Sequence, residues 1–390
     1  MSATRRRFLA GTVAGAAAAA AGPARATQRV PLPGDGQKAL VLTGGVNRGA
    51  YQAGAIAGLV EAAGLRDGQP LDYDLVAGAS IGAMTAYFVA TSQYSLLRGV
   101  WKTIASRELF AIKEPYRKIT VSSSGVATRV GAALSLAFGL VDNVKGIVDP
   151  AEIQKLLAEV IDPARTIDIP VYFTATNLTH KRTEVFVMRG TGPLGAPRQA
   201  RQDAILAPRR RPVRHPVAGN DVRAALLASA ALPVVFDPVA VPNVDDPSKT
   251  DEFIDGGIAD NVPIDVARRC ASDIDIIAVD PPRELEEDET YANALDVGAA
   301  AFAIMQARII QQTVKLAYAE SLLATGTPLR GTDLEDEEIP LRIRYMRPDE
   351  VLPGELGAFE DLAALDAMWE IGRADALRGW LAFSPTRAFG

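Results

Sequence analysis

The stretch that most constrains the fold of this chain is residues 74–84, with the sequence DLVAGASIGAM. In this short apolar run, Gly78 and Gly82 flank Ser80 in a Gly-x-Ser-x-Gly pattern. The pattern is typical of a sharp turn from a buried strand into a helix, where residues without a Cβ let strand and helix pass closely. We expect the turn to hold Ser80 in a strained, exposed position, with the N-terminus of a helix over residues 83–90 favouring negative charge beside it. The motif alone leaves two interpretations open, a nucleophilic serine or a small-residue turn in a chain with 33 glycines.

A second strand, turn and helix precede this stretch. Residues 38–43, KALVLT, are a continuous apolar run typical of a buried parallel strand. Gly44, Gly45, Val46, Asn47, Arg48 and Gly49 follow and open a helix over residues 50–63, a combination that can bind an anion through backbone N–H groups. The turn lacks the Gly-Lys-Ser/Thr of a P-loop and the glycine spacing of a dinucleotide site, which disfavours nucleotide binding. The two units suit acyl-group chemistry, in which the first turn would hold the oxyanion while Ser80 attacks a carbonyl.

Length, charge and cysteine content exclude some classes. A chain of 390 residues can bury a large core, in one α/β domain or in two smaller ones. The net charge of -6 argues against a nucleic-acid partner. The single cysteine, Cys270, excludes an intramolecular disulfide framework, and we expect it to pack as a small apolar side chain.

The N-terminal residues are typical of an export signal. Residues 4–9, TRRRFL, form a twin-arginine pattern, followed by an alanine-rich apolar run and by the Ala-x-Ala cleavage pattern of residues 24–26. This predicts a twin-arginine signal peptide over residues 1–26, a polar linker over residues 27–37, and export to the periplasm or outside the cell. A membrane anchor is the alternative, but the run over residues 8–24 is mostly alanine and glycine and falls short of about 20 apolar residues.

The remaining pattern alternates between helices and strands. Residues 130–141 can be a buried helix or a mobile cover over a lipid site, and residues 284–289 form an acidic loop. Expected elements are helices at 150–160, 221–230, 291–323 and 359–380, strands at 169–176, 183–188 and 275–280, and an edge strand at 341–345.

A region rich in Pro, Gly and Arg, residues 189–219, is predicted to be a flexible insertion. Two interpretations stay open for it, contact with anionic lipid head groups and a solvated loop without a partner. Its arginines are Arg198, Arg201, Arg209, Arg210, Arg211 and Arg214.

A nucleophilic serine needs a group that accepts its proton. The chain has two histidines, His180 in a polar turn and His215 in the arginine-rich region. Either could be catalytic in principle, but we expect both to be exposed loop residues. A carboxylate acting directly on Ser80 is therefore the simpler hypothesis. Because an unperturbed aspartate is a weak base, burial would have to raise its pKa, or the oxyanion site would have to lower more of the barrier.

Four motifs together resemble, in the same order, those of patatin-like phospholipases. They are Gly44-Gly45-Val46-Asn47-Arg48-Gly49, Gly78-Ala79-Ser80-Ile81-Gly82, Ser229-Ala230-Ala231-Leu232-Pro233 with Phe236 and Pro238, and Asp255-Gly256-Gly257. The resemblance extends from about residue 38 to residue 280. It implies an α/β class, a three-layer α/β/α fold with a mainly parallel central sheet, one catalytic domain over residues 38–390, and a helical C-terminal part from about residue 290.

The resemblance also implies roles for particular residues. Ser80 is then the nucleophile, and Asp255 is the base that orients it. Gly44, Gly45 and Val46, with Arg48, form the oxyanion loop, and Gly78 and Gly82 form the nucleophile elbow. No metal or other cofactor is implied.

Val46 departs from the family pattern, which usually has a third glycine at this position. A β-branched residue resists the positive φ values that glycine allows. If the amide of Val46 must face the substrate through a positive φ, the oxyanion site is impaired, whereas a negative φ would cost little.

We therefore predict an exported serine lipid acyl hydrolase that forms an acyl-Ser80 intermediate, with Asp255 activating water for deacylation. Phospholipids, lysophospholipids and neutral esters are candidate substrates, and an anionic membrane surface is a candidate partner. Acyl transfer to another alcohol would use the same residues. The rival hypothesis is a catalytically silent lipid- or partner-binding protein on the same scaffold.

Overall fold

The computed structural model describes residues 36–113, 145–207, 213–219, 221–280, 294–324 and 341–383. They all fall within one unit, Leu32–Gly390. The predicted signal peptide, most of the linker, residues 130–141, Arg209, Arg210 and Arg211, and the acidic residues 284–289 lie outside the described residues.

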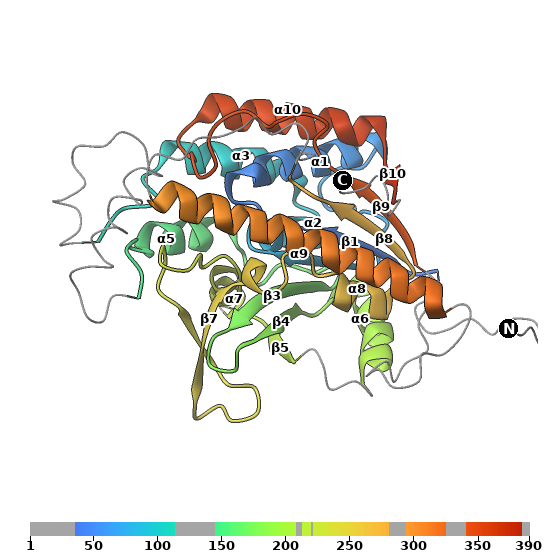
Figure 1. Ribbon diagram of the computed structural model, residues 1–390. Coiled ribbons are helices and arrows are strands. Elements are labelled where there is room, and N and C mark those ends of the chain that lie inside the picture. Colours follow the sequence, from blue (N-terminus) through green and yellow to red (C-terminus); the bar gives the residue numbers. More distant parts are fainter. Residues whose placement is uncertain are drawn as a thin grey trace, which may run out of the picture. The chain divides into compact units, whose positions relative to one another are not determined.

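A central sheet carries the site (Figure 1). Its middle consists of four parallel strands in the order β8 (Asp273–Ile277), β1 (Lys38–Leu42), β2 (Leu75–Ala79) and β3 (Val171–Asn177). β9 (Arg342–Met346) extends the parallel set beside β8, and the short β10 (Leu381–Ala382) pairs antiparallel with it, so the strand predicted at the edge lies one place inside. On the other side, β4 (Arg182–Met188) is antiparallel to β3 and parallel to β5 (Arg214–Val217).

A hairpin of β6 (Val239–Pro242) and β7 (Thr250–Asp255) joins the sheet at the carboxyl end of β3. The register pairs Ala175 of β3 with Asp255 of β7, and Leu42 of β1 with Gly78 of β2. The segments that follow β1 and β2 and the end of β7 are therefore brought to the same edge of the sheet, as ligand sites of open parallel sheets are.

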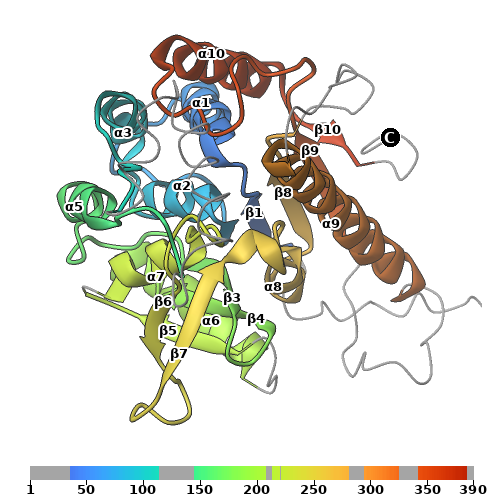
Figure 2. The same cartoon turned by 60° about the vertical axis from the view of Figure 1, so that its left-hand side comes forward.

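Helices cover both faces of this sheet. Leu40 and Leu42 of β1 pack into one apolar core, whereas Ala39 and Val41, which alternate with them, pack into the other. The first core includes α1 (Gly49–Ala62), α2 (Ile81–Ala90), α3 (Tyr94–Ser106), α5 (Ala151–Val160), α7 (Asp221–Ser229) and α10 (Leu362–Arg378). The second includes α8 (Ile264–Cys270), the end of α6 (Gly192–Leu206) and α9 (Ala294–Ala324). Figure 2 shows α1, α3 and α10 on one side of the strands, and α8 and α9 on the other. The predicted α/β/α fold with a mainly parallel sheet is confirmed.

The C-terminal helix packs closely against the helix that follows the first glycine turn. A Cβ on Gly54 of α1 would lie 2.0 Å from the carbonyl oxygen of Trp369, and one on Gly372 of α10 would lie 2.0 Å from that of Tyr51. Glycine is required at both positions because the two helix backbones are in contact there. The predicted closing helix, residues 359–380, is thus present as α10 and stabilises α1.

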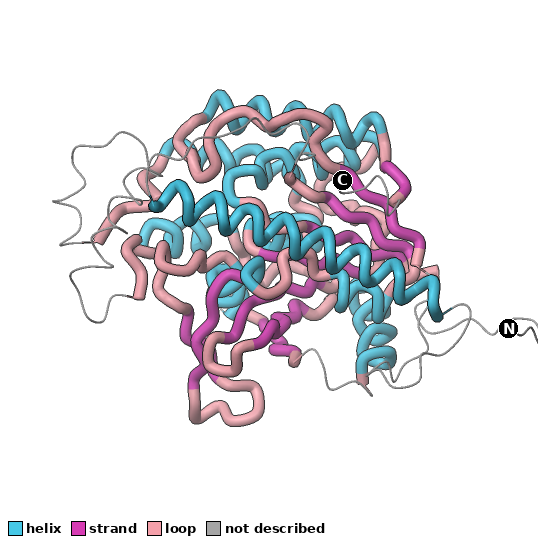
Figure 3. Tube along the Cα trace, in the orientation of Figure 1, coloured by secondary structure: helices cyan, strands magenta, loops and turns pink. Residues whose placement is uncertain are grey.

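The region at residues 189–219 is largely ordered as regular structure, contrary to the prediction of a loop (Figure 3). Residues 192–206 form α6 and residues 214–217 form β5, which pairs with β4. Arg198 donates to the Asp168 carbonyl, Arg201 pairs with Asp74, and Arg214 donates to the Leu206 carbonyl. The loop prediction is wrong here because strand pairing and these long-range contacts are not visible in a Pro, Gly and Arg composition.

Candidate active site

Ser80 lies in the sharp turn between β2 and α2, with φ 53° and ψ -125°. A Cβ on Gly78 would lie 2.4 Å from the Gly82 carbonyl oxygen, and one on Gly82 would lie 2.4 Å from that of Leu42. The two glycines therefore permit the close approach that the motif predicts, and the strained serine is present. Ser80 is only 7% exposed, however, so the expectation of an exposed side chain is wrong.

Asp255 ends β7 and contacts Ser80 directly. The Ser80 hydroxyl donates to Asp255 Oδ2 at 2.6 Å, and the Gly257 amide donates to Oδ1 at 2.7 Å. Because Asp255 is 1% exposed, burial raises its pKa to about 6, although the hydrogen bonds from Ser80 and Gly257 act in the opposite direction. The Asp255 carboxylate is therefore a stronger base than an ordinary aspartate. A carboxylate that accepts the proton of a serine directly, with no histidine between them, needs this higher basicity.

Ser229, at the end of α7, holds the serine turn from the other side. Its hydroxyl accepts a hydrogen bond from the Ser80 amide at 3.1 Å and donates to the Thr174 carbonyl at 2.7 Å. This bridge fixes the turn relative to β3. Ser229 belongs to one of the four motifs, but nothing in the sequence indicated its contacts.

The first glycine turn lies beside Ser80. The Gly44 amide donates to Asn261 Oδ1 at 3.0 Å and is therefore already engaged. Among the residues that the structure describes, the amides of Gly45 and Val46 have no hydrogen-bond acceptor. Arg48 forms an ion pair with Asp280 at 2.6 Å, and its amide donates to the Gly45 carbonyl. The amides of Gly45 and Val46 are thus the ones left available for a ligand.

Asn261 is a site residue that sequence reasoning missed. A Cβ on Gly44 would lie 2.3 Å from Asn261 Oδ1, and one on Gly257 would lie 2.7 Å from the same atom. The Asn261 side chain is therefore in contact with both glycine turns, the one beside Ser80 and the one that follows Asp255. The only signal in the sequence was its place in the segment after Asp255.

Val46 adopts φ 54°. Of the two alternatives for this position, the structure therefore has the positive φ, which strains the backbone of a valine. A non-glycine residue in this region costs about 1–3 kcal/mol. The next residue is firmly held: Asn47 donates to the Glu355 carbonyl at 2.9 Å and accepts from the Gly357 amide at 2.9 Å. The loop thus keeps a conformation that favours glycine because it is fastened to the segment preceding α10.

An apolar cavity of about 130 Å³ opens beside Ser80. Ser80 and Thr85 are its polar lining residues, and Thr85 uses its hydroxyl to donate to the Ile81 carbonyl. The spacing of the α2 residues in the wall places them on one helix face. The wall includes Ile81, Met84 and Phe88 of α2, Leu156 and Leu157 of α5, and the aromatic residues Trp101, Phe110, Phe236 and Phe359. Such a wall can bind a hydrocarbon chain whose polar end lies at Ser80.

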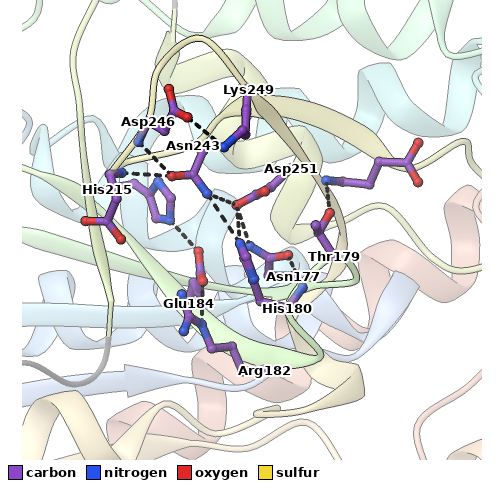
Figure 4. Close-up of polar contacts among 12 residues, drawn as sticks. Asn177, Thr179, His180, Arg182, Glu184, His215, Asn243, Asp246, Lys249 and Asp251 are labelled. Carbon is purple, nitrogen blue, oxygen red and sulfur yellow. Dashed lines mark hydrogen bonds and ion pairs between the residues drawn. The ribbon is translucent and has the colours of Figure 1, made fainter.

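The two histidines have other partners, as Figure 4 shows. His215 is buried in β5, with Nε2 2.5 Å from Glu184 Oε2, so the prediction that it lies in an exposed loop is wrong. His180 lies in the turn between β3 and β4, 3.3 Å from Asp251 Oδ2. Within the part of the chain that the structure describes, neither histidine contacts Ser80 or Asp255. This arrangement favours the carboxylate as the partner of the serine.

The described residues offer neither a metal site nor a membrane-spanning helix. They contain no group of three or more His, Cys, Asp or Glu side chains that could hold a metal ion. No helix within them is long and apolar enough to cross a membrane.

Comparison with known proteins identifies the family of the chain. The family model of the patatin-like phospholipases matches residues 40–268, more than half of the chain and a range that includes Ser80 and Asp255. The chain therefore belongs to the patatin-like phospholipases, a family of lipid acyl hydrolases. No curated protein matches the chain. Among solved structures, the crystal structure of VipD from Legionella pneumophila is similar with a TM-score of 0.34 and 16% identity, over 89% of this chain and 68% of VipD.

Proposed function

We propose that this protein hydrolyses carboxylic esters of lipids through an acyl intermediate on Ser80, with Asp255 as the base. The observation that carries the proposal is the 2.6 Å hydrogen bond from the hydroxyl of Ser80, which lines an apolar cavity, to Asp255. Family membership supports the same class of reaction. Phospholipids, lysophospholipids and neutral esters all present the required bond.

In the first half of the reaction, Ser80 Oγ attacks the carbonyl carbon of the ester and Asp255 accepts its proton. The negative charge on the carbonyl oxygen is stabilised by the amides of Gly45 and Val46 and by the N-terminus of α2. When the tetrahedral intermediate collapses, the bond to the leaving alcohol breaks and Asp255 returns the proton to the alcohol oxygen. The acyl group then remains on Ser80.

In the second half, water attacks the acyl-Ser80 ester while Asp255 accepts a proton from the water. Collapse of the second tetrahedral intermediate breaks the bond to Ser80 Oγ, which regains the proton from Asp255, and releases the carboxylic acid. In this scheme Gly44 and Arg48 position the loop without facing the substrate, because the Gly44 amide is bound to Asn261 and Arg48 to Asp280. The oxyanion loop contributes strongly to catalysis in this scheme, since one donor of this kind stabilises the transition state by about 3–4 kcal/mol.

The experiment is labelling with a fluorophosphonate probe, with and without lipid micelles, with the modified residue located by mass spectrometry. We expect labelling at Ser80 and none in Ser80→Ala. Asp255→Asn should lower the labelling rate strongly while the protein stays folded. Absence of labelling in folded protein under both conditions would contradict hydrolysis and favour a silent lipid-binding scaffold.

Export by the twin-arginine route is a separate proposal, supported by residues 4–9 and 24–26. Replacing Arg6 and Arg7 by lysine should retain the protein in the cytoplasm in a cell-fractionation experiment, and unchanged export would refute the route.

Contact of Arg209, Arg210 and Arg211 with anionic lipids also stays a proposal. It predicts binding to anionic vesicles that weakens with salt, and salt-independent binding would refute it.

A further inference from the structure

The oxyanion loop contributes one side chain to the apolar cavity, that of Val46. A glycine, as the family usually has there, would leave this part of the wall without a side chain. Valine occupies the position although φ 54° strains it, and alanine or glycine would be less crowded. Strain that is retained beside a reacting group points to a role at that place.

Val46 lines the same cavity as Ser80 and lies two residues after Gly44, where a Cβ would lie 3.1 Å from the Ser80 Cβ. In the proposed reaction the Val46 amide donates to the carbonyl oxygen of the substrate, and the Val46 side chain is attached to the Cα atom that follows this amide nitrogen. Because the same side chain lines the cavity, we expect the isopropyl group to contact the first carbons of the acyl chain.

The size of the cavity limits the rest of the acyl group. An engineered apolar cavity of about 150 Å³ holds benzene, a molecule of six carbons. The cavity here is slightly smaller, about 130 Å³, and its wall includes Ser80 and the α2 residues Ile81, Met84, Thr85 and Phe88. It is suited to an unbranched hydrocarbon of about six carbons.

We propose that Val46 is a specificity residue that selects unbranched acyl groups by narrowing the cavity next to the reacting carbonyl, while the volume of the cavity sets the medium length of the acyl chain. The inference rests on the proposed ester hydrolysis. A methyl branch on the carbon beside the carbonyl meets the isopropyl group, whereas a straight chain passes it. One methyl group in a fitted apolar pocket changes kcat/KM by about 10- to 200-fold.

The chain offers a matched control for the strain itself. Val234 is also a valine at positive φ, 68°, but it is 37% exposed and does not line the cavity. Replacing it by glycine relieves similar strain and removes no side chain from the wall. An effect of Val46→Gly that Val234→Gly does not share therefore comes from the side chain in the cavity.

The experiment compares kcat/KM for p-nitrophenyl esters of hexanoic acid, of hexanoic acid with an α-methyl branch, and of dodecanoic acid. We expect the wild type to prefer the straight hexanoate over the branched one by at least about tenfold, and over the dodecanoate. Val46→Gly should lose most of the preference for the straight chain. Val46→Ala, which keeps a Cβ and is the safer variant for folding, should lose part of it, and Val234→Gly should keep it.

Two results would overturn the inference alone. One is active wild type with equal kcat/KM for straight and branched hexanoate, and the other is a preference that survives in both Val46 variants or falls equally in Val234→Gly. Failure of the proposed function has a different signature, because wild-type protein would then neither cleave any of the esters nor react with a fluorophosphonate at Ser80. The Ser80→Ala variant gives the background rate for all of these measurements.

Discussion

Asp255 and Glu184 are both buried carboxylic acids of the same sheet, and each accepts a short hydrogen bond from another side chain. The Ser80 hydroxyl lies 2.6 Å from Asp255 Oδ2, and His215 Nε2 lies 2.5 Å from Glu184 Oε2. Their acidities nevertheless move in opposite directions. Burial raises the pKa of Asp255 to about 6. Burial also acts upward on Glu184, but hydrogen bonds from His215, Asn177 and Arg182 outweigh it and lower the pKa to about 2.

The difference lies in the donors. Asp255 accepts hydrogen bonds from a neutral hydroxyl and from a backbone amide. These donors satisfy both carboxylate oxygens without supplying a positive charge. Glu184 accepts hydrogen bonds from the Arg182 guanidinium, the His215 ring and the Asn177 side-chain amide. A buried acid with neutral donors keeps its capacity to accept a proton, whereas one with cationic donors becomes a fixed anion. The first arrangement suits a base and the second suits a structural anchor between β4 and β5.

The largest effect that would test this contrast is expected for Asp255→Asn. Activity toward an ester should fall about 10⁴-fold, because the amide cannot accept the proton of Ser80. The free energy of unfolding at pH 8 should rise by up to about 3 kcal/mol, since a charge whose pKa is shifted by about two units is no longer buried. Ester hydrolysis and urea denaturation measure the two quantities. An Asp255→Asn variant that is less stable than the wild type at pH 8 would contradict the view that the buried charge of Asp255 destabilises the folded protein.

Glu184→Gln should give the opposite pair of results. The free energy of unfolding should fall by about 1–3 kcal/mol, because the buried ring nitrogen of His215 loses the carboxylate that it contacts. The kcat for ester hydrolysis should stay within about twofold, since Glu184 does not contact Ser80 or Asp255. Arg182→Gln is the graded comparison, because it removes one of the three side chains that donate to Glu184 and should destabilise the protein less than Glu184→Gln does. A large loss of activity in folded Glu184→Gln would show that the two acids are coupled.

The pH dependence should separate the two acids in one protein. Because Asp255 must be deprotonated to act, kcat/KM should rise with pH up to about pH 6 and then level off. Its folded pKa lies above the ordinary 3.8, so its contribution to stability is complete below that value and is lost as the pH rises through about 6. Glu184 has a lowered pKa, so its contribution is present above the ordinary 4.5 and is lost as the pH falls toward 2. Urea denaturation of wild type and Asp255→Asn between pH 4 and pH 8 checks the sign, and a decline in stability that persists in the variant would contradict it.

The sequence was sufficient for features that depend on neighbouring residues. The turn around Ser80 follows from Gly78 and Gly82, and the buried parallel strands follow from continuous apolar runs such as residues 38–43. Asp255 could be placed beside Ser80 only through the resemblance to a family, because 175 positions separate the two residues along the chain.

Features that depend on distant pairing were missed. Asn47 holds the Glu355 and Gly357 backbone across more than 300 positions, and Asn261 reaches Gly44 across 217. His215 looked exposed because its neighbours are arginines and prolines, yet pairing of β5 with β4 buries it against Phe186. Side-chain amides and a lone histidine carry no periodic signal, so their roles appear only when the partner strands and loops are in place.

The smallest effect is expected for His180→Gln. This substitution tests whether an exposed histidine near a carboxylate contributes to stability or activity. His180 is 39% exposed and lies 3.3 Å from Asp251 Oδ2, an oxygen that also accepts from Asn177 and Asn243. Because Asp251 keeps two amide donors and the histidine is open to solvent, the free energy of unfolding should change by less than about 1 kcal/mol. Ester hydrolysis should be unchanged, whereas His215→Gln, at a buried pair, should be clearly destabilised. Thermal denaturation and kcat/KM measure both variants. A folded His180→Gln without activity would mean that the Ser80 and Asp255 pair needs a histidine base after all.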